Sequence, residues 1–129
     1  MMDLAGTRIW LAAAPLDMRQ SFDRLAEAVR VVLQQDPLSG HLFVFRSRGG
    51  HHLKILWYDG SGYCIYYKRL ERGRFVFPAA SGKALDSSGK SLVIDRAALM
   101  QLLRGAVPMS GAAAQGQAAA QGQAMPGKK

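Results

Sequence analysis

The sequence contains one cysteine, Cys64, in 129 residues. A disulfide within the chain needs two cysteines, and the common structural zinc sites need paired thiolates, so the sequence excludes both. This sparing use of cysteine fits a reducing cytoplasm. Long apolar runs are also missing, because no stretch approaches the roughly 18 to 20 residues that a membrane helix needs. Residues 1–17 lack the basic leading segment of a signal peptide. We therefore expect a cytoplasmic protein without a membrane partner.

Acidic residues are scarce, with nine Asp and Glu in the chain. A two-metal nuclease needs clustered carboxylates to hold its ions, and none of these residues has a spacing that indicates a shared ion. His51 and His52 are adjacent, and adjacent strand residues point to opposite faces, which argues against a metal-binding pair. No stretch matches a glycine-rich phosphate loop. We therefore expect no enzymatic activity, no catalytic residue, no metal site and no cofactor.

Basic residues are abundant, because 17 Lys and Arg give the chain a net charge of +8 and a pI near 10.2. A charge of this size attracts polyanions, and nucleic acid first among them. Within residues 41–78 only Asp59 and Glu71 are acidic, whereas seven residues are basic: Arg46, Arg48, Lys54, Lys68, Arg69, Arg72 and Arg74. This concentration of positive charge predicts a contact with nucleic acid.

The spacing of apolar residues predicts one strand, one helix and then a series of strands. Apolar residues recur at helical spacing after Ser21, which, like Asp17, is a candidate cap for the helix. Runs with a period of two follow, and the glycines of residues 59–62 suit a tight hairpin loop. The predicted strands are 7–13, 41–46, 53–59, 63–70 and a short 74–78 that ends at Pro78.

A second helix is predicted over residues 96–105, after the short apolar segment 92–95. Asp95 is its expected N-cap and Gly105 its expected end. A Gly-, Ser- and Lys-rich loop is expected over 81–91. From Ala106 the sequence becomes a low-complexity Ala, Gly and Gln repeat, which we expect to be a disordered tail. The prediction is one α+β domain over 1–105 and a tail over 106–129. The domain has an antiparallel sheet of four to five strands, packed by an N-terminal helix and a short C-terminal helix.

The strands suggest where the basic residues lie. Alternation along a strand places Lys54 on the opposite face from Trp57. If the first helix covers one face of the sheet, the other face is a surface of tyrosines and basic side chains, suited to phosphates and unpaired bases. The predicted nucleic-acid-binding residues are Arg46, Arg48, Lys54, Lys68, Arg69, Arg72, Arg74 and Trp57, of which Trp57 either touches bases or packs in the core.

Several sequence blocks resemble those of a known family. They are "PLDMRQSFDRLA" (15–26), "DPLSGHLFVFRSR" (36–48), "LKILWYDGSGYCIYYKRLERGRFVFP" (53–78) and "LMQLLRG" (99–105). Over residues 7–105 the chain closely resembles the TnpB-type accessory proteins of the IS-sixty-six insertion-sequence family, which are unrelated to the RNA-guided nuclease of the same name. The resemblance implies a role in transposition beside a larger transposase that carries the catalytic residues.

Three interpretations of function follow. The first is a non-catalytic accessory protein that binds the DNA ends of an insertion sequence through a basic sheet surface. The second is a protein-interaction module that docks the transposase of the same element without recognising DNA. The third is a nuclease, for which Tyr63, Tyr66 or Tyr67 would be the nucleophile.

Overall fold

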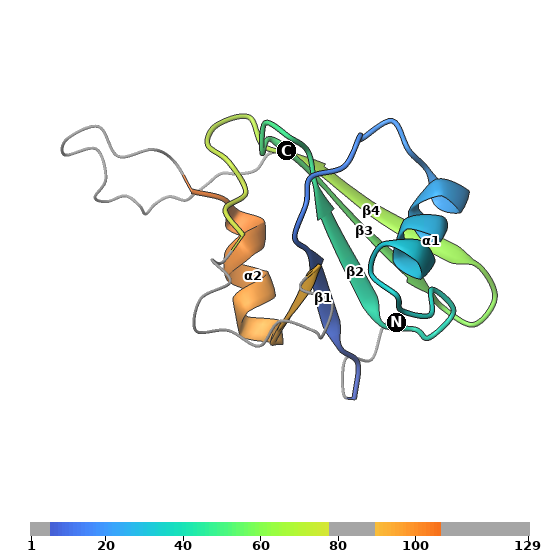
Figure 1. The fold of residues 1–129 in the computed structure, drawn as a ribbon. Helices are drawn as coiled ribbons and strands as arrows, with labels where there is room; N and C mark the ends of the chain where they lie inside the picture. The colour runs from blue at the N-terminus through green and yellow to red at the C-terminus, as the bar shows by residue number, and fades with distance from the viewer. Residues whose placement is uncertain (1–5, 78–89, 107–129) are drawn as a thin grey trace.

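A five-stranded sheet with a helix on each face forms the structure, a computed structural model that describes residues 6–77 and 90–106 (Figure 1). The strand order is β4-β3-β2-β1-β5. The strands are β1 (Ile9–Ala12), β2 (Leu42–Arg46), β3 (His52–Tyr58), β4 (Tyr63–Arg69) and β5 (Ser91–Ile94), and the helices are α1 (Phe22–Val31) and α2 (Arg96–Arg104). The predicted α+β class and both predicted helices are confirmed.

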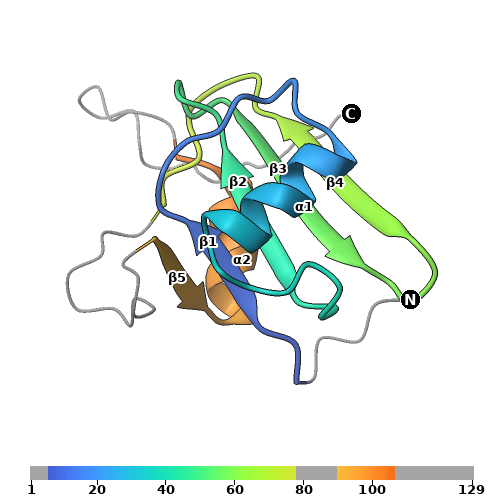
Figure 2. The ribbon, with the colours of Figure 1, turned by 45° about the vertical axis from the view of Figure 1, so that its right-hand side comes forward.

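The sheet is mixed, whereas the sequence analysis expected antiparallel pairing throughout. β1 and β2 are parallel, with Ile9 opposite Leu42, and the three other pairs of this sheet are antiparallel. The reason is the connection between β1 and β2, which contains α1 (Figure 2). A helical crossover returns the chain to the end of the sheet where it started, so the second strand runs in the same direction as the first.

α1 covers one face of the sheet with the apolar side that its sequence spacing predicted. Leu25, Ala26 and Val29 are buried against Phe43 and Leu56 of the sheet. Burying each Leu or Val contributes about 1.5–3 kcal/mol, which exceeds what helix propensity supplies. Ser21, one of the two candidate caps, occupies the N-cap position, but the expected hydrogen bond from its side chain to the first turn is absent.

α2 covers the opposite face. Leu99 and Leu102 pack with Leu11, Val44 and Ile55 in a second core. The predicted ends of this helix are confirmed: Asp95 accepts a hydrogen bond from the amide of the third helical residue at 2.8 Å, and Gly105 follows the helix with a φ of 75°. Because both faces are covered, the expectation of one open sheet face is wrong.

The hairpin predicted over 59–62 is confirmed, since Asp59 Oδ1 accepts hydrogen bonds from the amides of Ser61 and Gly62 at 2.9 and 3.0 Å.

The strand predicted over 74–78 is absent from the described residues 74–77. Arg74 there forms an isolated bridge with Ala106, and Phe75 is buried in the core under α2. The apolar alternation of this segment thus reflects two side chains that pack on this core, the buried Phe75 and the partly buried Phe77.

Two predictions concern segments that lie mostly outside the described residues. The loop expected over 81–91 lies outside the described residues except for its last two, and of these Ser91 is the first residue of β5, a strand that was not predicted. The tail expected over 106–129 lies outside the described residues except for Ala106. The domain boundary at residue 105 therefore stays a prediction. Neither α1 nor α2, the helices of the described ranges, has the length and apolar character needed to cross a membrane.

Candidate nucleic-acid interface

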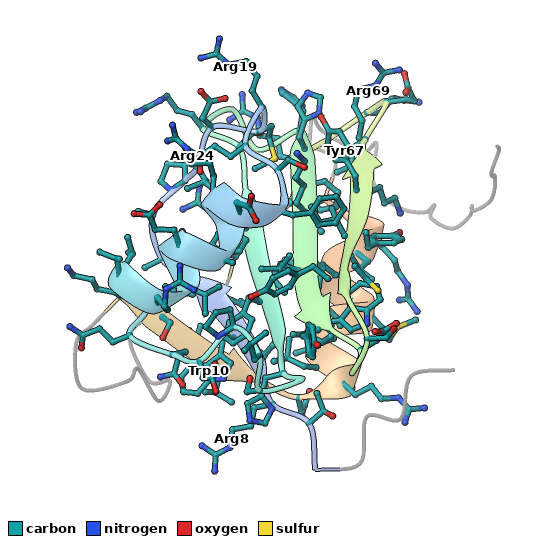
Figure 3. All side chains as sticks on the ribbon, turned by 90° about the vertical axis from the view of Figure 1, so that its right-hand side faces the viewer. Arg8, Trp10, Arg19, Arg24, Tyr67 and Arg69 are labelled. Carbon is teal, nitrogen blue, oxygen red and sulfur yellow. The ribbon has the colours of Figure 1, made fainter. Side chains whose placement is uncertain are left out.

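Four exposed arginines lie at one end of the sheet, where β2 and β4 finish and β3 begins. Arg48 is in the turn between β2 and β3, Arg69 is the last residue of β4, and Arg72 and Arg74 are in the segment after it. We call this set (Arg48, Arg69, Arg72 and Arg74) the arginine end. Figure 3 shows Arg69 at this end of the molecule and Arg8 at the opposite end.

The two segments that carry these arginines are held together by hydrogen bonds. The amide of Leu70 donates to the carbonyl of His51 at 2.9 Å, and the amide of Phe75 donates to the carbonyl of Gly50 at 2.7 Å. The ring nitrogen Nδ1 of His51 lies 3.0 Å from the carbonyl oxygen of Gly73. Arg48, Arg72 and Arg74 are therefore attached to one rigid unit.

Gly50 allows this close contact. Its φ is +83°, in the left-handed region that favours glycine. A Cβ atom added at this position would lie 3.4 Å from Cβ of Arg74. Gly50 thus allows the turn to approach the segment that carries Arg74, a contact that the sequence alone did not indicate.

Two ion pairs lie at or beside the arginine end, and both are exposed to solvent. Arg69 contacts Glu71 at 3.0 Å, and Arg19 contacts Asp17 at 2.7 Å. The hydrogen bonds from Arg19 lower the pKa of Asp17 from 3.8 to about 2, so this carboxylate stays ionised. Within residues 6–77 and 90–106, Arg48, Arg72 and Arg74 form no ion pair. The arginine end therefore displays positive charge that the described acidic residues do not neutralise.

Lys54 is not on an outward surface, although it was a predicted site residue. It is 7% exposed on the α1 side of the sheet. Its Nζ donates a 2.7 Å hydrogen bond to the carbonyl of Gln20 and lies 4.8 Å from the ring centroid of Tyr67. This ammonium group fixes the segment before α1 to the sheet.

Lys68, Arg46 and Trp57 lie on the other side of the sheet, facing α2. Lys68 Nζ donates to the carbonyl of Leu103 at 2.8 Å, where a helix end favours a cation. Arg46 Nη2 donates to the carbonyl of Ala13 at 3.1 Å, and Trp57 is half-buried against the core under α2. The eight predicted site residues are thus divided between two covered faces and one exposed end, so the expectation that they share one outward face is wrong.

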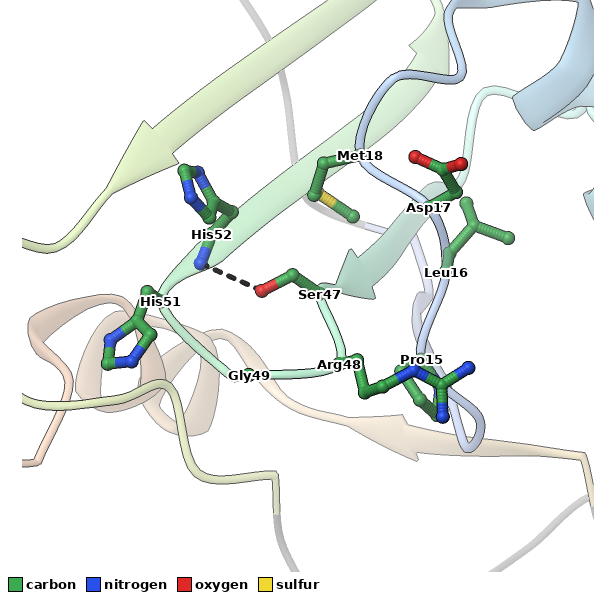
Figure 4. Close-up of a pocket in the computed structure, with 9 residues that line it drawn as sticks. All are labelled: Pro15, Leu16, Asp17, Met18, Ser47, Arg48, Gly49, His51 and His52. Carbon is green, nitrogen blue, oxygen red and sulfur yellow. Dashed lines mark hydrogen bonds between the residues drawn. The ribbon is translucent and has the colours of Figure 1, made fainter.

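A cavity of about 450 Å³ that no sequence pattern indicated adjoins the arginine end (Figure 4). Its walls come from two segments about thirty residues apart in the chain, so no local pattern could indicate it. Arg48 belongs both to the cavity and to the arginine end. The lining residues are Pro15, Leu16, Asp17, Met18, Ser47, Arg48, Gly49, His51 and His52.

Comparison with known proteins identifies the family. The family model described as IS66 Orf2-like protein matches residues 7–110. The chain belongs to the IS66 Orf2-like family. It is similar to two curated proteins of Sinorhizobium fredii (strain NBRC 101917 / NGR234), both named as uncharacterized. One, y4hO, is 51% identical over 85 residues, which cover 66% of this chain and 74% of y4hO. The other, y4jC, is 39% identical over 83 residues, which cover 64% and 71%. No solved structure matches.

The family confirms the resemblance inferred from the sequence blocks and connects this IS66 Orf2-like protein with insertion-sequence transposition. No three His, Cys, Asp or Glu side chains among the described residues gather into a candidate metal site. Burial and the neighbouring Asp59 carboxylate raise the pKa of the Cys64 thiol, which disfavours the reactive thiolate.

Proposed function

We propose that this IS66 Orf2-like protein is a non-catalytic accessory factor of transposition that binds DNA in the cytoplasm through the arginine end. The observation that carries the proposal is the set of three exposed guanidinium groups without ion pairs, those of Arg48, Arg72 and Arg74, on two segments joined by hydrogen bonds. Arg69 lies beside these three arginines, but it forms an ion pair with Glu71.

Phosphate is the chemical group that best suits this arrangement. A guanidinium presents several N–H donors in a planar fork that matches phosphate oxygens, and it keeps its charge at every physiological pH. Arginines fixed on a rigid scaffold lose less conformational entropy on binding than arginines on a free tail. Lys54, Lys68, Arg46 and Trp57 support the proposal indirectly, by holding the two helices and the connecting segments on the sheet.

A salt titration of DNA binding tests the proposal. The purified chain is mixed with fluorescent duplexes of insertion-sequence ends and of random sequence, and the affinity is measured as the salt concentration rises. Each neutralised phosphate contributes about −0.9 to the slope of log K against log salt. Three phosphate contacts therefore predict a slope of about −2.7. A slope near zero, or no binding at low salt, would refute the proposal.

Docking of the transposase is the second candidate function. Exposed apolar side chains lie at the carboxyl end of α1 and in the loop after it: Val31 is 64% exposed, Val32 42% and Leu38 56%. By the order of the elements, this region lies toward the opposite end of the sheet from the arginine end. Co-elution of the two purified proteins without DNA, lost in a Val31→Glu variant, would support this function. Co-elution that depends on added DNA would contradict it.

A further inference from the structure

The cavity beside the arginine end is lined by both apolar and polar side chains. Pro15, Leu16 and Met18 line it from the segment between β1 and α1, and Ser47, Gly49 and the two histidines line it from the turn between β2 and β3. Its volume of about 450 Å³ lies in the range of pockets that hold small organic groups. A flat heterocycle with a polar edge suits such a site.

The polar atoms of the cavity wall offer both donors and acceptors. Ser47 Oγ accepts hydrogen bonds from the amides of Gly50 and His52, both at 3.2 Å, so its own hydroxyl hydrogen is left to donate. The carbonyl of Gly73 can only accept, so Nδ1 of His51 carries the hydrogen of their bond. In a ring that carries this single hydrogen, the other nitrogen is an acceptor. Nucleobase edges present donors and acceptors of these kinds.

An aromatic pair extends the cavity wall. The rings of His52 and Tyr67 have centroids 5.8 Å apart, and the hydroxyl of Tyr67 lies 3.0 Å from Nδ1 of His52. Lys54 Nζ lies over the Tyr67 ring, so the ring is held in place, and yet Tyr67 is 52% exposed. A fixed and exposed aromatic side chain is the usual platform on which an unpaired base stacks.

The charge around the cavity favours a phosphate chain. Arg48 borders the cavity and carries no ion pair in the described part of the chain, so it can bind the phosphate next to a bound base. Asp17 also lines the cavity, but its carboxylate is bound by Arg19 at 2.7 Å. A base in a duplex reaches such a cavity only after it is unpaired and unstacked, at a cost that an already unpaired base avoids.

We propose that this cavity, with the His52–Tyr67 pair at its edge, binds a base of an unpaired nucleotide, so that the protein prefers DNA with a single-stranded extension to fully paired DNA. This inference rests on the proposed function, since the arginine end holds the phosphates of the same strand.

Three probes test the inference with the full chain, by fluorescence anisotropy at one salt concentration. They are a blunt duplex, the same duplex with a short single-stranded extension, and the same extension built from abasic nucleotides. The abasic probe has the charge of the second probe and lacks its bases. We expect the extension with bases to bind roughly tenfold more tightly than the abasic one, the effect of stacking one base. Equal affinity for these two probes would overturn the inference.

The two proposals fail in different ways. Equal affinity for all three probes, together with a salt-dependent affinity in the titration described above, would remove the cavity proposal and leave the proposed function intact. Binding of none of them would remove both. Fluorescence of a 2-aminopurine in the extension gives a readout that needs no variant, because stacking in the cavity quenches it and unchanged fluorescence contradicts the inference.

A pair of neighbouring tyrosines supplies matched variants. Tyr67→Ala removes the aromatic platform, and we expect it to abolish the preference for the extension with bases. Tyr66→Ala removes a ring of the same strand that is 40% exposed on the other side of the sheet. We expect this control to keep the preference. Equal loss in both variants, with melting temperatures equal to that of the unmodified protein, would overturn the role of Tyr67.

Discussion

Replacing Arg72 and Arg74 by glutamine removes two of the three unpaired guanidinium groups of the arginine end and leaves the backbone unchanged. Both side chains are exposed, and the backbone bridge between Arg74 and Ala106 does not involve the guanidinium group. Exposed substitutions of this kind change the free energy of unfolding by less than about 0.5 kcal/mol. We therefore expect a double variant, Arg72→Gln with Arg74→Gln, that folds normally.

The effect on DNA binding follows from counting phosphates. Losing two phosphate contacts makes the slope of log K against log salt shallower by about 1.8. Between 50 and 200 mM salt, the unmodified protein should then lose about tenfold more affinity than the double variant. The assay is fluorescence anisotropy on one duplex at several salt concentrations, with a melting curve for each protein.

A matched pair at the opposite end of the sheet supplies the control. Arg8 and Arg96 are exposed there, beside the paired ends of β1 and β5. Replacing both by glutamine changes the net charge by the same amount, and we expect the salt slope to stay within experimental error. If the two double variants had the same slope, binding would follow total charge, and the reasoning about the arginine end would be refuted.

Three other predictions concern the scaffold. Asp95→Ala removes the side-chain cap of α2, and urea denaturation should show a loss of about 1 kcal/mol; unchanged stability would contradict the capping role. Gly105→Ala should cost about 1–3 kcal/mol, because φ is +75° and the new Cβ would lie 2.5 Å from Cδ1 of Leu70; an unchanged melting temperature would contradict this. The Asp17 carboxyl should titrate by NMR near pH 2, and Arg19→Gln should return its pKa toward 3.8. Because the folded pKa is lowered, this pair stabilises the fold above pH 3.8 and the contribution is lost as the pH falls through about 2. A midpoint near 3.8 in the unmodified protein would contradict the pairing.

Sequence patterns predicted the features that depend on near neighbours. The loop over 59–62, the cap at Asp95 and the end of α2 at Gly105 were all predicted, because each involves atoms within a few residues along the chain. The cap of α1 shows the limit of such reasoning. Ser21, one of the two candidate caps, occupies the N-cap position, but its side chain makes no capping hydrogen bond, and the other candidate, Asp17, lies four residues earlier and binds Arg19.

The concentration of basic residues in 41–78 includes Arg48, Arg72 and Arg74, which are exposed and without ion pairs among the described residues. That these residues bind nucleic acid stays a prediction. The cavity could not be predicted, because its two walls approach each other only when β1 and β2 lie side by side. The aromatic pair at its edge needs the register that places His52 opposite Arg69, and so beside Tyr67.

The sequence by itself determined the first four strands, both helices, the hairpin and the excess of positive charge, because periodicity, turn residues and composition are properties of short segments. It did not determine β5, and it predicted a strand over 74–78 that the described residues 74–77 do not form. Tertiary structure alone decided which cations are free. Lys54, Lys68 and Arg46 are bound to backbone carbonyls 34, 35 and 33 residues away. The sequence shows that a strand residue is basic, but it does not show whether the side chain binds a distant carbonyl or faces solvent. Only the packing of both helices on the sheet distinguishes these two cases.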